Sequence, residues 1–159
     1  MTAFEGIVGD LEYPMFIVTA RADDDEPLGC LVGFTTQSSI DPPRFIACLS
    51  HNNRTYRRGR DAPVLAVHAV PADAADLAEL FGGETGDEMN KFARCAWHEG
   101  PEGVPILDRC ENWFAGRVLD RFDAGDHDAF LLEPLTGESG GQDEFTFHRA
   151  KRIDPGHEA

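Results

Sequence analysis

Positive charge is scarce in this sequence: 14 Lys and Arg residues stand against 29 Asp and Glu residues, giving a net charge of −15 at pH 7. Because nucleic-acid backbones are bound through Lys and Arg, this balance argues against a nucleic-acid partner. No apolar run approaches the roughly 20 residues that a membrane helix requires. Residues 1–6 also lack the basic flank and apolar stretch of a secretory signal peptide. We therefore expect a soluble protein that is not exported and does not enter a membrane.

Two phosphate-binding motifs are missing as well. The sequence contains neither a Walker loop nor a Gly-x-Gly-x-x-Gly fingerprint. A Rossmann unit needs the second of these motifs to bring its backbone close to a dinucleotide. A nucleotide-binding protein with this sequence must therefore use another scaffold, and a small β-barrel with donor-rich loops is one such scaffold.

The four cysteines, Cys30, Cys48, Cys95 and Cys110, show no paired spacing. The first two lie in apolar runs, where cysteine behaves as a small hydrophobic residue. Free thiols are typical of a reducing compartment, so we expect a cytoplasmic protein. Cys95 and His98 form a single Cys-x-x-His without a second pair at fitting spacing, so no metal site is expected.

With 159 residues, the chain is long enough for one core and too short for two. We expect a single domain over residues 1–159, with its core at about 10–150. Apolar runs rich in β-branched and aromatic residues predict six strands and a short seventh one. These strands are expected at residues 14–20, 29–34, 44–50, 64–70, 113–122, 129–135 and 145–147.

Helical spacing appears in one long stretch, which begins after Asp73 and ends before Gly82. A shorter helix is predicted from Asp87 to Phe92. Residues 35–39 and 137–142 are expected to be loops, and the tail after Lys151 to be poorly ordered.

Many short strands with a helix after the fourth are typical of an antiparallel barrel rather than an alternating βαβ sheet. The expected fold is therefore mostly β: a closed or nearly closed, Greek-key-like barrel with one or two short helices.

The first candidate binding segment follows the second predicted strand. Hydroxyl groups and exposed backbone amides beside a glycine suit an anionic or heteroaromatic ligand. The alternative is an ordinary hydroxyl-rich turn. The residues of this segment are Gly33, Phe34, Thr35, Thr36, Gln37, Ser38 and Ser39.

The second candidate segment, residues 50–60, follows the next predicted strand and supplies hydroxyl, amide and guanidinium donors suited to a phosphate. It contains four arginines within seven positions, although the chain is acidic. The alternative is a solvated run of charges. Two donor-rich segments that flank one strand favour the ligand interpretation. The candidates here are Ser50, His51, Asn53, Thr55 and Arg57.

His127 lies in a predicted turn, where its imidazole could contact a bound nucleotide or act as an acid or base near neutral pH. The alternative is a loop histidine that is hydrogen-bonded to Asp126 or Asp128.

The order of these segments resembles the flavin reductase-like family over roughly residues 10–135. In that family a strand ending in Val-Thr precedes a glycine, a loop rich in Ser, Thr and Asn, and a hydrophobic-Asp-Pro-Pro step. A Gly-Asp-His turn before a hydrophobic strand is a further mark. The matching pieces are Pro14–Thr19, Gly29–Pro43, Cys48–Ser50, Leu77–Phe81, Lys91–Phe92, Gly103–Leu107 and Gly125–Phe130.

The resemblance implies a split β-barrel homodimer that binds FMN, or less often FAD, near the dimer interface. NADH or NADPH would pass a hydride to the flavin, and a monooxygenase partner could receive the reduced flavin. Gly33–Ser39 would contact the isoalloxazine and ribityl groups. Ser50, Asn53, Thr55 and Arg57 would hold the phosphate, and His127 would lie near the nicotinamide.

Two alternatives to a flavin reductase stay open at this point. One is a flavin-binding protein without turnover, which stores or senses flavin or carries electrons. The other is haem or pyridoxamine-type chemistry on a related barrel.

Overall fold

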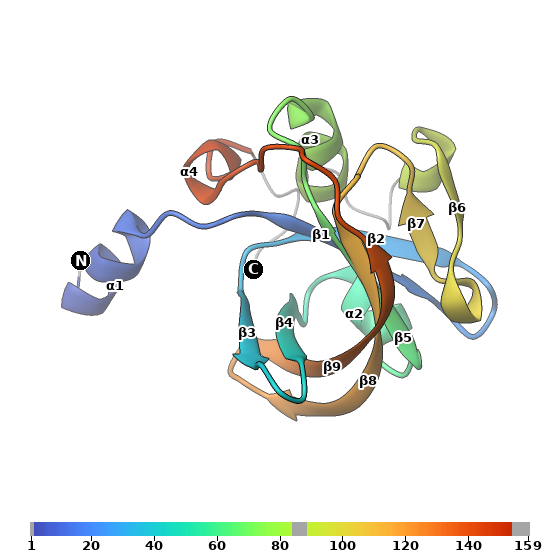
Figure 1. The fold of residues 1–159 in the computed structure, drawn as a ribbon. Helices are drawn as coiled ribbons and strands as arrows, with labels where there is room; N and C mark the ends of the chain where they lie inside the picture. The colour runs from blue at the N-terminus through green and yellow to red at the C-terminus, as the bar shows by residue number, and fades with distance from the viewer. Residues whose placement is uncertain (1, 84–88, 154–159) are drawn as a thin grey trace.

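The computed structural model of the protein describes residues 2–83 and 89–153. Strands dominate in these ranges, and short helices decorate them (Figure 1). The elements in chain order are α1 (Ala3–Asp10), β1 (Phe16–Arg21), β2 (Pro27–Val32), β3 (Thr35–Ser39), β4 (Arg44–Ser50), α2 (Arg54–Gly59), β5 (Val64–Ala69), α3 (Ala75–Gly83), η1 (Lys91–Ala93), β6 (Trp97–Glu99), η2 (Pro101–Gly103), β7 (Pro105–Leu107), β8 (Trp113–Asp123), β9 (His127–Glu138) and α4 (Phe147–Ala150).

Seven strands form one sheet in the order β2-β1-β5-β8-β9-β4-β3, and β6 pairs with β7 in a second, smaller sheet. Every strand pair is antiparallel. The prediction of a mostly β, antiparallel fold is thus confirmed. None of the helices in the described part of the chain is long and apolar enough to span a membrane.

The large sheet must curl, because β2 and β3 lie at its opposite edges and yet follow each other in the chain. Only Gly33 and Phe34 separate these two strands, so the two edges approach each other at this corner. Figure 1 shows the strands wrapping around a common interior. Among the described residues no ladder joins β2 to β3, and full barrel closure stays a prediction.

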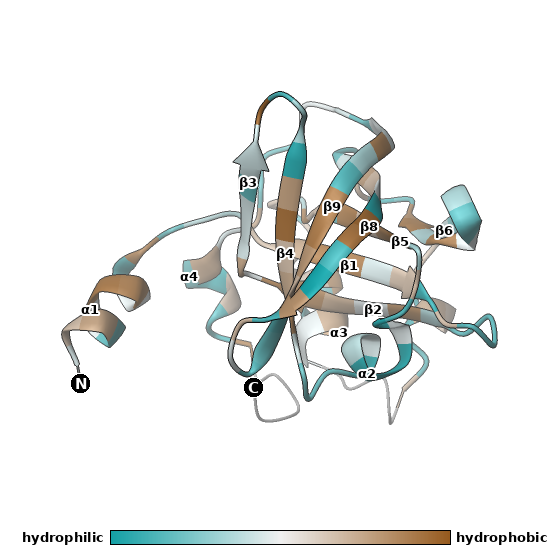
Figure 2. Ribbon diagram, turned by 90° about the horizontal axis from the view of Figure 1, so that it is seen from below, coloured by the Kyte–Doolittle hydropathy of each residue, from teal (hydrophilic) through white to brown (hydrophobic). Residues whose placement is uncertain are grey.

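The interior of the curled sheet is filled by apolar side chains from β1, β2, β4, β5 and β9, among them Val18, Leu49 and Phe130. A second cluster, around Phe81 and Phe92, packs α3 and η1 against the other side of β1 and β2. The hydropathy colouring shows the same distribution, with apolar residues along the strands and polar residues on α2 (Figure 2).

His68 is a fully buried polar residue on β5. Its Nδ1 donates to the carbonyl oxygen of Ile17 at 2.9 Å, and its Nε2 accepts from the Leu107 amide at 3.0 Å. Because burial disfavours the charged imidazolium, the pKa of His68 is lowered to about 4. His68 therefore joins β1, β5 and β7 as a neutral imidazole.

Several expected elements differ from the observed ones. Residues 35–39 form strand β3 instead of a loop, so the main helix, α3, follows the fifth strand and not the fourth. The predicted strand at 145–147 is replaced by isolated bridges at Glu144 and Thr146 and by α4. Helices α1 and α2 were not predicted.

In the predicted helix at 87–92, residues 87–88 lie outside the described residues, and the structure has a single 3-10 turn at Lys91–Ala93. The predicted disorder after Lys151 concerns mainly residues 154–159, which also lie outside the described residues.

Candidate functional site

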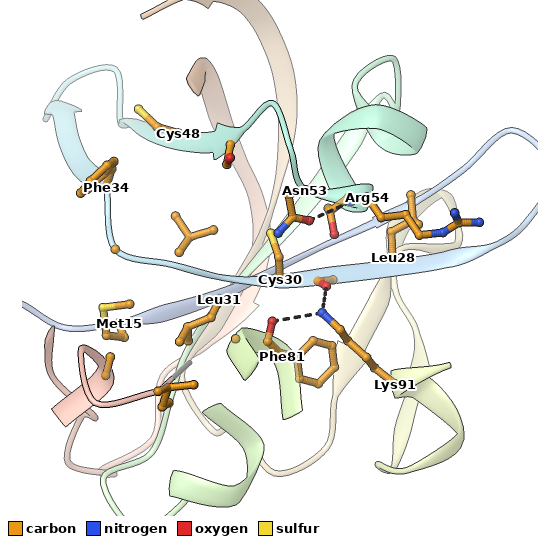
Figure 3. A pocket seen from close by; sticks show the side chains of 18 of the residues that line it. Met15, Leu28, Cys30, Leu31, Phe34, Cys48, Asn53, Arg54, Phe81 and Lys91 are labelled. Carbon is orange, nitrogen blue, oxygen red and sulfur yellow. Dashed lines mark hydrogen bonds between the residues drawn. The ribbon is translucent and has the colours of Figure 1, made fainter. Parts of the chain in front are cut away.

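A cavity of about 700 Å³ wraps around the free edge of β2. This volume is within the range of small-molecule and cofactor sites. Figure 3 shows side chains from β2, β4, α2 and η1 converging on it. One part of its wall is polar and contains Ser50, Asn53 and Thr55, and another part is apolar and contains Met15, Leu31 and Phe81.

The free edge of β2 offers backbone hydrogen-bonding groups to this cavity. Ala22 N donates to Glu26 O at the start of the β1–β2 hairpin, and the hydrogen-bonded pairs then alternate along the strands. By this alternation the backbone groups of Gly29 and Leu31 point away from β1. Lys91 Nζ donates to the Gly29 carbonyl at 3.2 Å, as expected for an outward-facing oxygen.

The polar corner is built where β4 ends and α2 begins. Asn53 caps the helix: its side-chain Oδ1 accepts from the Thr55 backbone amide at 2.9 Å. The backbone amide of Asn53 donates to Ser50 O at 3.0 Å. Thr55 lines the cavity but is only 1 % exposed, and its side chain lies near the Cys30 thiol. The corner therefore holds hydroxyl and amide groups in set positions beside the cavity.

Charged groups at the rim are paired with one another. Arg54 Nε and Nη2 donate to the two carboxylate oxygens of Glu26 at 2.7 and 2.8 Å, and both residues line the cavity. Arg58 on the next turn of α2 donates to Asp24 at 2.6 Å. These ion pairs tie α2 to the β1–β2 turn, which fixes the position of the polar corner relative to β2.

His127 begins β9 and lines the cavity beside Phe34, with 5.0 Å between the ring centroids. Its Nδ1 contacts Asp126 Oδ1 at 2.6 Å, and this hydrogen bond lowers the pKa of Asp126. His127 thus combines the two interpretations offered by the sequence, because it is bonded to its neighbour and still faces the cavity.

A second histidine contact supports the corner from behind. His51 Nε2 donates to Asp128 Oδ1 at 2.7 Å, and the Tyr56 hydroxyl donates to Asp128 Oδ2 at 3.0 Å. Burial raises the pKa of Asp128, but the bonds from His51 and Tyr56 outweigh it and leave that pKa below its usual value. His51 therefore joins β4 to β9 and does not line the cavity.

The structure brings together part of the predicted site. Gly33, Phe34, Ser50, Asn53, Thr55 and His127 all line the cavity. Arg57 and the strand residues Thr35, Thr36, Gln37, Ser38 and Ser39 do not line it in this single chain, and most of β3 is exposed.

Sequence reasoning missed many of the lining residues, and two of them, Lys91 and Cys30, carry chemically distinctive side chains. Lys91 is only 6 % exposed, and besides Gly29 it donates to the Phe81 carbonyl at 3.1 Å. Two signals in the sequence could have pointed to Lys91: the chain has only two lysines, and apolar Phe92 and Ala93 follow this one directly. Cys30 is buried, which raises the pKa of its thiol to about 11, so this thiol is a poor nucleophile.

Other kinds of site find no support in the described residues. No group of three or more His, Cys, Asp or Glu side chains there could hold a metal ion. His98 is instead bonded to Asp108 at 2.6 Å. Residues 137–141 match the spacing Gly-x-Ser-x-Gly of hydrolases, but they lie at the end of β9 and no helix follows directly, as a nucleophile elbow would require.

The arrangement suits a planar heteroaromatic ligand that carries a phosphate. Apolar walls can accept a flat ring, the outward backbone groups of β2 can hydrogen-bond to its edge, and the corner at Asn53 and Thr55 can donate to an anion.

Comparison with known proteins gives three findings. The model of the flavin reductase like domain matches residues 8–153. A "Probable flavin reductase" of Rhizobium meliloti is 27% identical over 87% of this chain and 44% of its own length, so the chain spans less than half of that relative. The reductase component of a 4-nitrophenol monooxygenase from Rhodococcus opacus is 28% identical over 93% of this chain and 77% of its own length.

Among solved structures, an NADH:FAD oxidoreductase of Streptomyces globisporus superposes with a TM-score of 0.81. The superposition covers 91% of this chain and 86% of the other chain, with 23% sequence identity. At this identity the similarity supports the fold alone.

Proposed function

Because the chain belongs to the flavin reductase-like domain family, we propose that it is an NAD(P)H-dependent flavin reductase. It binds FMN, or FAD, in the cavity around β2 and uses NADH or NADPH as the hydride donor. The proposal rests on one observation. A single cavity of about 700 Å³ has hydrogen-bond donors on one part of its wall and apolar side chains on another.

The phosphate group of the flavin is assigned to the corner of Ser50, Asn53 and Thr55. The Asn53 side chain caps α2 and Thr55 is almost completely buried, so both are held before a ligand arrives. Preorganised donors lose little entropy on binding, which suits recognition of an anion in a chain of net charge −15. Arg57 stays a candidate for a contact from outside the cavity.

The ring system is assigned to the free edge of β2, with Gly33 and Phe34 at the end of the strand. A bound flavin supplies the hydride acceptor, and the protein supplies position and electrostatics. The outward amide and carbonyl of Leu31 are suited to orient the edge of such a ring. A Cβ atom at position 33 would lie 3.1 Å from the side chains of Tyr13 and Met15, so glycine keeps this end of the cavity open.

His127 is assigned to the nicotinamide. Asp126 holds its Nδ1, which leaves Nε2 to contact a ligand. We assign His127 to binding and orientation of the nicotinamide carboxamide, with the ring of Phe34 as its support.

We also propose that the protein is a homodimer. Phe130 and Leu132 on β9 point into the core, so Leu131 and, by the strand register, Ile46, Cys48 and Phe122 lie on the opposite face. An antiparallel sheet with one buried face usually shows water a polar second face. Here that outer face carries exposed Phe34 and Phe122, and a second copy would cover it and the adjoining cavity. Thr35–Ser39 on edge strand β3 would then lie near this interface.

A monooxygenase that uses reduced flavin is the proposed partner, because a relative is named as the reductase component of such a system. The cytoplasm is the proposed location, since NAD(P)H is available there and the described cysteines are all free thiols.

The test is NADH and NADPH oxidation by the purified chain, with and without added FMN or FAD. Oxidation that depends on flavin, together with bleaching of the flavin absorbance under anaerobic conditions, supports the proposal. Flavin that binds and stays oxidised would favour a storage or carrier protein instead. Absence of both binding and turnover would contradict the proposed function.

A further inference from the structure

Helix α1 has an apolar face that is not packed against the rest of its own protomer. None of its residues is buried, and it stands apart from the curled sheet (Figure 1). Phe4, Ile7, Val8 and Leu11 are 71%, 65%, 37% and 52% exposed. Their spacing of three and four residues places them on one stripe of the helix. The stripe is large and apolar, and in this protomer water covers it.

The helix is also too short to be stable by itself. It has eight residues, whereas isolated helices below about 12–15 residues are marginal in water. A capping box between Thr2 and Glu5 closes its N-terminus, with Glu5 N donating to Thr2 Oγ1 and Thr2 N donating to Glu5 Oε2. Such a cap contributes about 1 kcal/mol, which does not replace the packing of an apolar face.

The tether between α1 and the body of the protomer is short. Tyr13 is stacked on Phe147 at 4.7 Å, and Glu12 Oε1 accepts from the His148 amide at 3.0 Å. Met15 N donates to Phe145 O at 2.8 Å. The chain is thus held to α4 from Glu12 onward, and Leu11 alone separates this anchor from the helix. In this position no part of the protomer buries a residue of α1.

We propose that α1 is an exchanged arm, whose apolar stripe packs against a second copy of this chain. This inference rests on the proposed homodimer and names the segment that stabilises it. The same chain exposes a matching surface: the outer sheet face, defined by Phe34, Ile46, Phe122 and Leu131, lies toward the β3 side, where α1 projects (Figures 1 and 2). Two copies related by a two-fold axis exchange both arms, which gives a closed assembly.

Charge argues against a lipid surface as the occupant. Amphipathic helices that bind membranes carry Lys or Arg on their polar face. The only charged residues of α1 are Glu5 and Asp10, and the whole chain has a net charge of −15. In contrast, β4 and β8 present Arg44 and Arg117, which share the single carboxylate of Glu133. An acidic arm on this face would therefore lie near two arginines.

The size of the arm fits the needs of a dimer. Four large apolar side chains in each arm, counted twice by symmetry, add several hundred Å² to an interface, and a stable one buries roughly 1,200–2,000 Å² in total. The arms therefore supplement the contact between the two sheet faces and do not replace it.

The first test compares two charge insertions on α1. Ile7→Glu places a carboxylate in the stripe, and Gly9→Glu places one on the opposite side, where nothing lies within 4 Å. We expect Ile7→Glu to raise the dimer dissociation constant, measured by sedimentation equilibrium, roughly a hundredfold or more, because each dimer loses the contact twice. Gly9→Glu should change it less than about threefold. Equal effects of the two variants would overturn the inference.

The second test identifies the covering molecule. A photoreactive benzophenone side chain is placed at position 4, and protein of normal isotope composition is mixed with heavy-isotope protein before irradiation. Adducts between light and heavy chains are the expected result. Adducts within one chain in a sample that is dimeric would reject the arm and leave the homodimer intact. A protein that is monomeric at all concentrations would reject both, while the flavin-dependent oxidation assay decides the proposed activity separately.

Discussion

Two groups of polar side chains on the same curled sheet differ in where their hydrogen bonds go. At the β1–β5–β7 junction, His68 uses both ring nitrogens, and the buried Thr19 hydroxyl donates to Pro105 O at 2.6 Å. At the β4–α2 corner, Asn53 and Thr55 hold each other in place and line a cavity. The first group is closed on itself, and the second is open to a ligand. The first should therefore govern stability, and the second should govern binding.

The largest effect on stability is expected for His68→Phe, which removes the imidazole ring at the closed junction. The substitution leaves the Leu107 amide buried without a partner and removes the ring bond to the Ile17 carbonyl, which keeps its backbone partner on β5, so we expect a loss of about 3 kcal/mol of unfolding free energy in urea denaturation. The matched control is His98→Phe: this exposed histidine pairs with Asp108, and its loss should cost less than about 1 kcal/mol. Similar costs for the two variants would mean that the His68 junction is not a stabilising centre.

The pH dependence of stability sharpens the same contrast. The pKa of His68 is about 4 in the folded chain and 6.5 in its unperturbed state, so between these values only the unfolded chain binds the proton. The His68 contribution is therefore complete above about pH 6.5 and declines as the pH falls toward 4, by up to about 3 kcal/mol. Urea titrations from pH 7.5 to 4 measure it. His68→Gln keeps a donor and an acceptor without the titration, and this component should disappear from its profile.

The open group is tested by Thr55→Ala. Removal of the hydroxyl should weaken FMN binding by about 2 kcal/mol and riboflavin binding by much less, because riboflavin has no phosphate. Fluorescence titration with both ligands measures the difference, and Thr55→Ser, which keeps the hydroxyl, should restore most of the FMN affinity. An equal loss for FMN and riboflavin would place the phosphate elsewhere. Unfolding free energy, measured in parallel, separates a binding defect from damage to the fold.

The sequence predicted the mostly β fold because its apolar runs are short and rich in β-branched residues, and it placed α3 correctly. It missed β3, because Thr35–Ser39 is polar and mostly exposed on an edge, where no apolar alternation marks a strand. It also missed α2, a six-residue helix whose stability comes from the Asn53 cap and from ion pairs to Glu26 and Asp24. Such contacts join distant segments, and spacing along the chain does not reveal them.

For the candidate site, the sequence indicated which residue types are present. It could not indicate in which direction each side chain points. Ser50, Asn53 and Thr55 were grouped with His51 and Arg57 because all lie in one polar segment. The fold separates them: His51 turns to Asp128 on β9, while Asn53 and Thr55 turn to β2. Lys91 was overlooked as a lining residue because it becomes one only through its contacts with Gly29 and Phe81.

Arg57→Ala should have the smallest effect on FMN affinity. It tests whether the donor corner at Asn53 and Thr55 extends further along α2. Arg57 lies on α2 one turn after Asn53, but it does not line the cavity. If its guanidinium acts on a bound phosphate from outside the cavity, across solvent, FMN affinity should fall by less than about 0.5 kcal/mol, and less still at high salt. Isothermal titration calorimetry with FMN at low and high ionic strength measures this change in affinity. A loss as large as that of Thr55→Ala, independent of salt, would show that Arg57 reaches the phosphate directly. The donor corner would then extend along α2 beyond the cavity, and the run of arginines would be part of the binding site.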